Sequence, residues 1–195
     1  MSFSRAELLA FRGATLPDLV GPATRLLFVG INPGLLTVAV QAHFAKRGNR
    51  FYPALYRAGI TDRVIDAADG FRPEDRAYLL ERGIGITSIV PLATARADEL
   101  TRDELIAGGA ALRDRVESIR PAVVAVLGIT AYRIAFGRPD ARVGRQPETW
   151  ADAQVWVAPN PSGLNAHETP GSLAAAYRTI ASAAGLDLYP QPATD

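Results

Sequence analysis

The clearest pattern along the chain is a series of short apolar runs that alternate with segments of helical periodicity. Four runs, each bounded by turn-forming residues, are typical of buried β-strands. They cover Arg25–Gly30, Ile84–Val90, Pro121–Gly128 and Gln154–Pro159. Strands that alternate with helices predict a parallel sheet covered on both faces. We therefore expect an α/β fold with three layers, α/β/α, around a central, mainly parallel sheet of four to five strands.

Helix boundaries are indicated by capping residues and by proline and glycine. Thr101 and Glu104 form a capping box, which opens a long amphipathic helix. Thr169 is the expected cap of the last helix, with Pro170 at its first position. Further helical segments are predicted at 5–11, 49–59, 73–83 and 130–136. Residues 35–49 and 137–148 are predicted to be loops. The chain is predicted to form a single domain over 1–195, with a core at about 24–185 and a frayed tail after Leu188.

Composition narrows the class of protein. Apolar residues make up 48% of the 195 residues, which is typical of a globular chain. No apolar run is long enough to span a bilayer, and the first residues lack the pattern of a signal peptide. The chain has no cysteine and only two histidines without metal-binding spacing, so we expect no disulfide, no bound metal and a cytoplasmic location. Because the net charge is only +1, a polyanionic partner would have to be held locally.

Two asparagine-proline turns follow the first and the last predicted strand. They are Asn32-Pro33-Gly34 and Asn160-Pro161-Ser162-Gly163. Proline holds the preceding asparagine in an extended conformation, and we expect a type II turn with Gly34 at positive φ, then a type I turn. One such turn is explained by turn preference alone. Since parallel strands end at the same edge, where open α/β sheets bind ligands, two turns there predict a shared site.

The sequence around these turns resembles the mismatch-specific uracil-DNA glycosylases of the thymine-DNA glycosylase family. Gly30-Ile-Asn-Pro-Gly34 matches the first motif of that family, and Asn160-Pro-Ser-Gly-Leu164 matches the second. Phe44-Ala45 and Asn49-Arg50-Phe51 lie between the two motifs at the spacing that the family shows. The resemblance extends from about Thr24 to Gly185. It implies a uracil-DNA glycosylase-like fold.

The resemblance implies that a monofunctional, monomeric enzyme hydrolyses the N-glycosidic bond of uracil, or of related damaged or mismatched bases, in double-stranded DNA, especially opposite guanine. No metal and no organic cofactor are implied, and the base would be flipped out of the duplex. Asn32 would position the attacking water, and Phe44 would stack on the base. The other residues to which the resemblance assigns roles are Ile31, Ser88 and Asn160 at the base, Leu164 as a wedge in the duplex, and Gly163 and Asn165 at the orphaned guanine.

Other interpretations of the sequence remain open. The chain would be a binding module if it recognised mismatched or abasic DNA with little catalysis. A cytosolic nucleotide-binding α/β protein is a third possibility, although no phosphate-cradling glycine loop supports it. Phe44 is also a reasonable core aromatic, and a lone loop histidine such as His43 is usually solvated or packed. Arg47, Arg50 and the arginines at 138, 142 and 145 would either meet phosphates or form a solvated face.

Overall fold

A five-stranded sheet runs through the middle of the protein, seen in a computed structural model that describes residues 3–163 and 168–192. The strand order is β2-β1-β3-β5-β4. Four strands are parallel, and β4 pairs with β5 in the antiparallel direction. The strands are β1 (Leu26–Gly30), β2 (Ile84–Ser88), β3 (Val123–Leu127), β4 (Gly144–Trp150) and β5 (Ala153–Ala158). The expected α/β fold with a mainly parallel sheet is confirmed.

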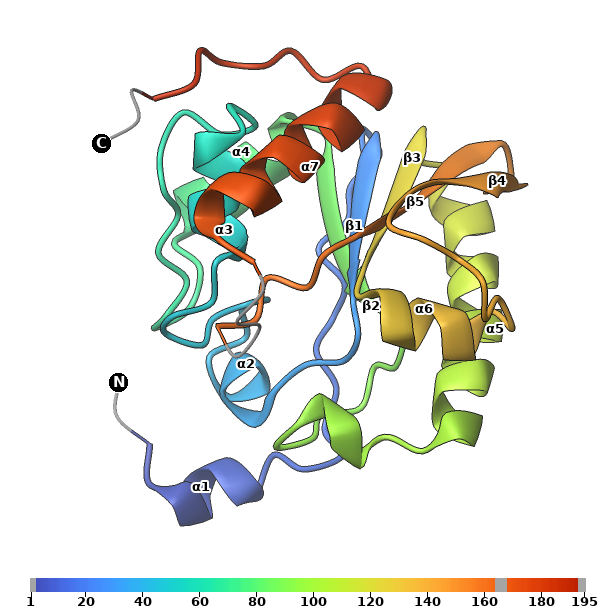
Figure 1. Ribbon diagram of the computed structural model, residues 1–195. Helices are drawn as coiled ribbons and strands as arrows, with labels where there is room; N and C mark the ends of the chain where they lie inside the picture. Colours follow the sequence, from blue (N-terminus) through green and yellow to red (C-terminus); the bar gives the residue numbers. More distant parts are fainter. Residues whose placement is uncertain (1–2, 164–167, 193–195) are drawn as a thin grey trace.

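Helices cover both faces of the sheet. On one side lie α3 (Phe51–Arg57), α4 (Pro73–Glu81) and α7 (Pro170–Ala183), and on the other lie α5 (Arg102–Ile119) and α6 (Ile129–Ala135) (Figure 1). Two short helices, α1 (Arg5–Leu9) and α2 (Leu35–Ala39), and a 3₁₀ turn at Ala97–Glu99 lie beyond the ends of the strands. The capping box predicted at the start of α5 is present, and Thr169 is the N-cap of α7 as expected, where it also forms a capping box with Ser172.

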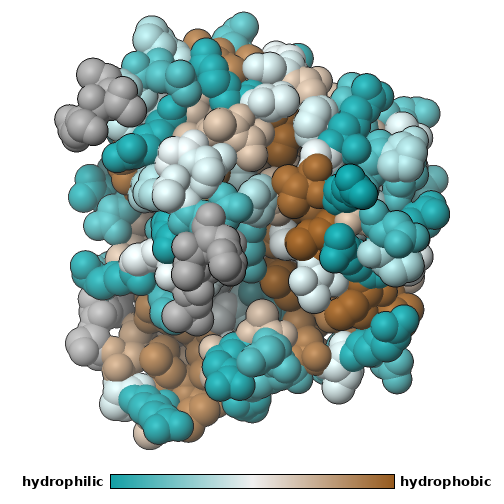
Figure 2. Space-filling model, viewed as in Figure 1, coloured by the Kyte–Doolittle hydropathy of each residue, from teal (hydrophilic) through white to brown (hydrophobic). Residues whose placement is uncertain are grey.

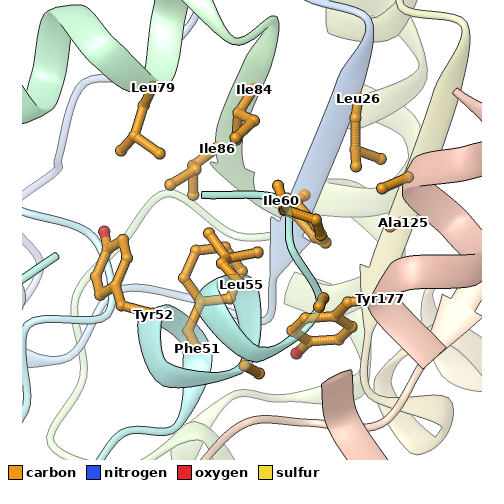
Figure 3. Close-up of a cluster of buried hydrophobic side chains, with 14 of the residues drawn as sticks. Leu26, Phe51, Tyr52, Leu55, Ile60, Leu79, Ile84, Ile86, Ala125 and Tyr177 are labelled. Atoms are coloured by element: carbon orange, nitrogen blue, oxygen red, sulfur yellow. The ribbon is translucent and has the colours of Figure 1, made fainter. Parts of the chain in front are cut away.

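The core has two halves because alternate residues of each strand point to opposite faces. In β1, Leu26 and Phe28 pack with the α3, α4 and α7 side, whereas Leu27 and Val29 pack with the α5 and α6 side. Figure 3 shows the first half, where Phe51 of α3 and Tyr177 of α7 lie over the sheet. All residues of β1, β2 and β3 are buried, as expected for strands covered on both faces.

The loop predicted at 35–49 contains the short helix α2, so this prediction is wrong for its first turn. Gly34 is the N-cap of α2 with φ −76°, and it therefore does not have the positive φ that a type II turn requires. A helix of five residues is not stable alone, and it depends on tertiary packing. Leu35 and Val38 supply that packing in a small core with Leu16 and Ala93.

The arginine-rich loop predicted at 137–148 is also wrong in part, because its second half belongs to β4. Within β4, Gln146 and Trp150 are buried while Arg145, Pro147 and Thr149 are exposed, which is the pattern of an edge strand. The register shifts between Arg145 and Thr149, next to a proline that has no N–H to donate to the ladder. Because Gly144 and Pro147 are typical of loops, the alternation of buried and exposed residues in this segment did not indicate a strand.

The surface is mainly hydrophilic on the face shown in Figure 2, with brown, apolar patches near α1 and α2 at the lower left and on the right-hand side of the view. The chain after Leu188, which was expected to fray, is attached as far as it is described. The N–H of Tyr189 donates to the carbonyl of Gly59 at 2.7 Å, and the side-chain amide of Gln191 donates to the carbonyl of Arg57 at 3.3 Å.

None of the described helices has both the length and the apolar character needed to cross a membrane.

Candidate active site

A cavity of about 180 Å³ lies at the carboxyl ends of the parallel strands and is lined by both asparagine-proline turns. Five of the predicted site residues line it: Ile31, Asn32, Phe44, Ser88 and Asn160. A neighbouring hollow of about 290 Å³ is lined by Gly163 together with residues 46–50 and shares Ser162 with the first cavity. Leu164 and Asn165, which complete the predicted set, lie outside the described residues.

The two turns meet across the end of β3, which lies between β1 and β5 in the sheet. Gly128 follows β3 at φ +135°, a conformation that favours glycine. A Cβ atom at this position would lie 3.5 Å from Cδ1 of Ile31 and 3.9 Å from Nδ2 of Asn160. In the second turn, Oδ1 of Asn160 accepts a hydrogen bond from the N–H of Ser162 at 3.0 Å. The fold thus brings together two motifs that are about 130 residues apart.

The direction of the Asn32 side-chain amide is fixed by its hydrogen bonds. Its Nδ2 donates to the hydroxyl of Thr94 at 2.7 Å and to the carbonyl of Leu92 at 3.1 Å. A carbonyl oxygen only accepts, and the Thr94 hydroxyl uses its proton on the carbonyl of Arg96 at 2.7 Å. Both partners therefore require the NH₂ group on this side. Oδ1 of Asn32 has no hydrogen bond from any described residue and is available to a small donor such as water.

Phe44 contributes an aromatic ring to the cavity. The ring stacks on Phe51 with centroids 4.1 Å apart and an interplanar angle of 27°. Gly30 leaves space beside it, since a Cβ there would lie 3.4 Å from Cζ of Phe44. The backbone of Phe44 has φ +56°, a left-handed conformation that costs of order 1–3 kcal/mol for a residue other than glycine. Such strain is typical of functional sites, where the surrounding structure holds a residue in place.

His43 lies beside Phe44 and is buried in the wall of the cavity. Its Nε2 lies 3.1 Å from the carbonyl oxygen of Pro17. Burial lowers the pKa of His43 from its ordinary value of 6.5 to about 4, against the opposite effects of the Pro17 bond and the Asp18 charge. His43 is therefore neutral at pH 7, so it is a packed histidine and not a proton donor to the cavity through Nε2.

A partly buried polar network lies behind the cavity at the end of β2. Arg115 of α5 donates to the backbone carbonyl of Ser88 at 2.7 Å and lies 3.8 Å from a carboxylate oxygen of Asp18. The Thr87 hydroxyl donates to the same carboxylate at 2.6 Å. Sequence reasoning missed Asp18 and Arg115, because residues so distant along the chain give no local signal of their contact.

Arg50 is engaged with the second turn, although it was considered as a phosphate contact. Its guanidinium donates to the carbonyl of Gly163 at 3.2 Å and to that of Glu168 at 2.5 Å. Its backbone N–H donates to the carbonyl of Pro161 at 2.9 Å. A Cβ on Gly163 would lie 2.7 Å from the carbonyl oxygen of Gly48, so this close approach requires glycine. Arg50 therefore attaches the second turn to the loop before α3.

The cavity has both polar and apolar walls, and its described residues form no arrangement typical of a metal centre. Over residues 3–163 and 168–192, no group of three or more histidine, cysteine, aspartate or glutamate side chains could hold a metal ion. The groups that converge on the cavity are an amide, a hydroxyl, a neutral imidazole and an aromatic ring, contributed by Asn32, Ser88, His43 and Phe44. They suit the binding of a small, flat, uncharged molecule with hydrogen-bonding edges.

Comparisons with known proteins agree with this geometry. Residues 17–181 match the Uracil DNA glycosylase superfamily. The fold is similar to the solution NMR structure of a candidate uracil DNA glycosylase from Methanosarcina acetivorans, with a TM-score of 0.56 and 15% sequence identity. That similarity covers 87% of this chain and 98% of the other. At this level of identity the structural likeness supports the fold.

Proposed function

The chain belongs to the Uracil DNA glycosylase superfamily, which supports a DNA glycosylase activity, and on this premise we propose that it removes uracil from double-stranded DNA, especially opposite guanine. The observation that carries the proposal is the fixed amide of Asn32, whose Oδ1 has no described protein donor in a cavity that Phe44 also lines. Oδ1 would accept a hydrogen bond from a water molecule and place it beside C1′ of the deoxyribose.

The reaction that follows is hydrolysis of one bond. The water oxygen bonds to C1′, the bond between C1′ and N1 of uracil breaks, and the base leaves with the electron pair as an anion. The water proton passes to solvent, and the base is protonated after it departs. An asparagine is not a general base at neutral pH, so catalysis depends on the position of the water and on stabilisation of the anion. Ile31 and Phe44 line the cavity, and their backbone N–H groups donate no hydrogen bond to a described residue, so we propose that these N–H groups stabilise the anion.

The size of the cavity agrees with a single extruded base. Its volume of about 180 Å³ is smaller than the roughly 300–1,000 Å³ of pockets for larger ligands. One face of the Phe44 ring is covered by Phe51, and the ring also lines the cavity. Stacking of a base on an aromatic side chain contributes about 1–3 kcal/mol, which would offset part of the cost of unstacking the base from DNA.

DNA is the proposed partner, held close to the cavity and not by the net charge of +1. The exposed Lys46 borders both the cavity and the neighbouring hollow, and Arg47 borders the hollow beside Gly163. These cations would meet phosphates on either side of the extruded nucleotide. We further propose that the protein acts as a monomer in the cytoplasm, at the nucleoid.

The direct experiment is incubation of the protein with a duplex that contains one uracil opposite guanine, followed by alkali. Strand cleavage after alkali, and none before it, would show a monofunctional glycosylase. Cleavage without alkali would contradict the monofunctional mechanism. Tight binding to the duplex without cleavage after alkali would instead favour the alternative, a protein that binds mismatched or abasic DNA.

Preference for mismatches is proposed to come from Leu164, acting as a wedge, and from Gly163 and Asn165 at the opposite base. Burying a leucine side chain contributes roughly 1.5–3 kcal/mol, which is comparable to the cost of extruding a base. We expect Leu164→Ala to slow uracil release from a uracil–adenine pair more than from a uracil–guanine mismatch, because the mismatch is already easier to open. Single-turnover rates on the two duplexes measure this, and equal losses in both would argue against a wedge.

Thr94 is expected to act on the reaction through Asn32. Thr94→Val keeps the shape of the side chain but removes the oxygen that accepts from Nδ2 of Asn32 at 2.7 Å. We expect uracil release to fall about 10-fold or more, since a displaced water loses its alignment, while DNA binding stays near wild type. Thr94→Ser retains the hydroxyl and should restore most of the rate. A rate that is equally low in both variants would contradict this role.

A further inference from the structure

We propose that His43 determines base specificity: its Nδ1 accepts a hydrogen bond from the ring N–H of an imide base such as uracil and disfavours cytosine. The inference rests on the proposed function and concerns the same cavity. It assigns the residue that recognises the Watson–Crick edge of the base, whereas Asn32 and Phe44 act on the water and on the ring face.

The position of the proton on His43 follows from its neighbour. Nε2 lies 3.1 Å from the carbonyl oxygen of Pro17, which can only accept, so Nε2 carries the proton. In a neutral imidazole the other nitrogen then has a lone pair and no proton. The residue is held in place by burial and by the Tyr52 hydroxyl, which donates to the backbone carbonyl of His43 at 2.8 Å. Its orientation therefore does not depend on a bound ligand.

The ring remains neutral near pH 7. The nearby charges are those of Asp18, which raises the pKa of His43, and Arg76, which lowers it; burial has the largest effect and lowers the pKa to about 4. The lone pair on Nδ1 is consequently present near pH 7, where double-stranded DNA is stable. Nδ1 therefore stays unprotonated and does not become a hydrogen-bond donor.

Nδ1 is free to interact with a molecule in the cavity. Nδ1 receives no hydrogen bond from the part of the chain that the structure describes. It is also absent from the fully buried polar atoms without a partner, so Nδ1 keeps some accessible surface. His43 lines the cavity together with Asn32, Phe44 and Ser88. Nδ1 thus belongs to a ring of fixed orientation, on a residue that lines the same cavity as the residues proposed to act on the base.

A fixed acceptor distinguishes the two bases that matter most in DNA. Uracil carries an N–H at position N3 between two carbonyl groups, whereas N3 of cytosine is itself an acceptor. A site that pairs with an N–H rejects an analogue that lacks it, because two acceptors face each other without a proton between them. The Ser88 hydroxyl, which also lines the cavity, rotates to donate or accept and so cannot make this distinction.

The test compares two bases that differ at this edge but are both activated for departure, 5-fluorouracil and 5-fluorocytosine, each placed opposite guanine. We expect the wild-type protein to release 5-fluorouracil much faster. His43→Gln, which reproduces the Nε2 donor to Pro17 but lacks the Nδ1 acceptor, should lower 5-fluorouracil release roughly 10-fold. It should raise 5-fluorocytosine release, because the acceptor that faces N3 of cytosine is gone. His43→Asn, whose amide reaches the position of Nδ1, should retain more of the preference.

The outcomes separate this inference from the proposed function. If the wild-type protein releases neither base, and no uracil, the proposed function is contradicted and the inference with it. If it releases 5-fluorouracil and His43→Gln keeps the same ratio of rates between the bases, the inference alone is overturned. An equal fall for both bases, with a lower melting temperature, would show a purely structural His43 and would also overturn it.

Discussion

Replacing Asn32 by alanine is expected to lower uracil release by at least about 100-fold while leaving DNA binding close to that of the wild-type protein. The variant removes the one fixed oxygen proposed to hold the attacking water, and loss of alignment in a positioned reaction costs on the order of 100-fold. Binding depends on the phosphates and on the stacked base, which the variant keeps. Single-turnover release of uracil and fluorescence anisotropy with a labelled duplex measure the two quantities.

A suitable control is Gln154→Ala. It removes an amide near the amino end of β5, at the end of the sheet opposite to the cavity. Among the described residues, this amide accepts only a long hydrogen bond, from Trp156 at 3.3 Å. We expect the control to release uracil at the wild-type rate. Release by Asn32→Ala at the same rate would refute the role of Asn32, and a parallel loss of DNA binding would show that the residue binds DNA and does not position water.

Replacing Phe28 by alanine is expected to lower the free energy of unfolding by about 3–5 kcal/mol, a large share of the roughly 5–15 kcal/mol that stabilises a typical domain. Phe28 is 0% exposed, and its ring lies 5.1 Å from Phe51 and 5.4 Å from Tyr177. Because Phe51 also carries the stacked ring of Phe44, the cavity should be affected too. Urea unfolding followed by circular dichroism measures the change.

The control for this prediction is Val143→Ala, at a side chain that is 52% exposed. It should change the free energy of unfolding by less than about 0.5 kcal/mol. If Phe28→Ala unfolded at nearly the same urea concentration as this control, the aromatic cluster between β1, α3 and α7 would not be the centre of the core.

The sequence predicted most of the sheet and the long helices because their signals are local. A run such as Arg25–Gly30 leaves few alternatives to a buried strand. The capping box at Thr101 and the cap at Thr169, which Pro170 follows, mark where two helices begin. The errors fall where local and tertiary preferences differ. Helix α2 exists because Leu35 and Val38 find a small core, and β4 exists because β5 offers it a partner.

The residues of the candidate site could be predicted from the sequence, but their contacts and orientations could not. The two asparagine-proline turns were identified from the sequence, and the structure places both on one cavity. The bond from Asn32 to Thr94 spans 62 residues, and the contact of His43 with Pro17 spans 26. Neither leaves a periodic pattern in the chain. Which atom of a side chain faces the cavity is decided by such contacts, so it became visible only in three dimensions.

The irregular strand β4 has a consequence for how this protein behaves at high concentration. The outer edge of a sheet can recruit strands from other molecules and so start aggregation. Here the edge carries Pro147, the exposed Arg145 and a shift in register, so a foreign strand would find an interrupted row of hydrogen-bonding groups. Because β4 pairs with the apolar β5, β5 is not exposed to other molecules. We therefore expect the protein to remain free of fibrils at concentrations at which an uncovered β5 would start them.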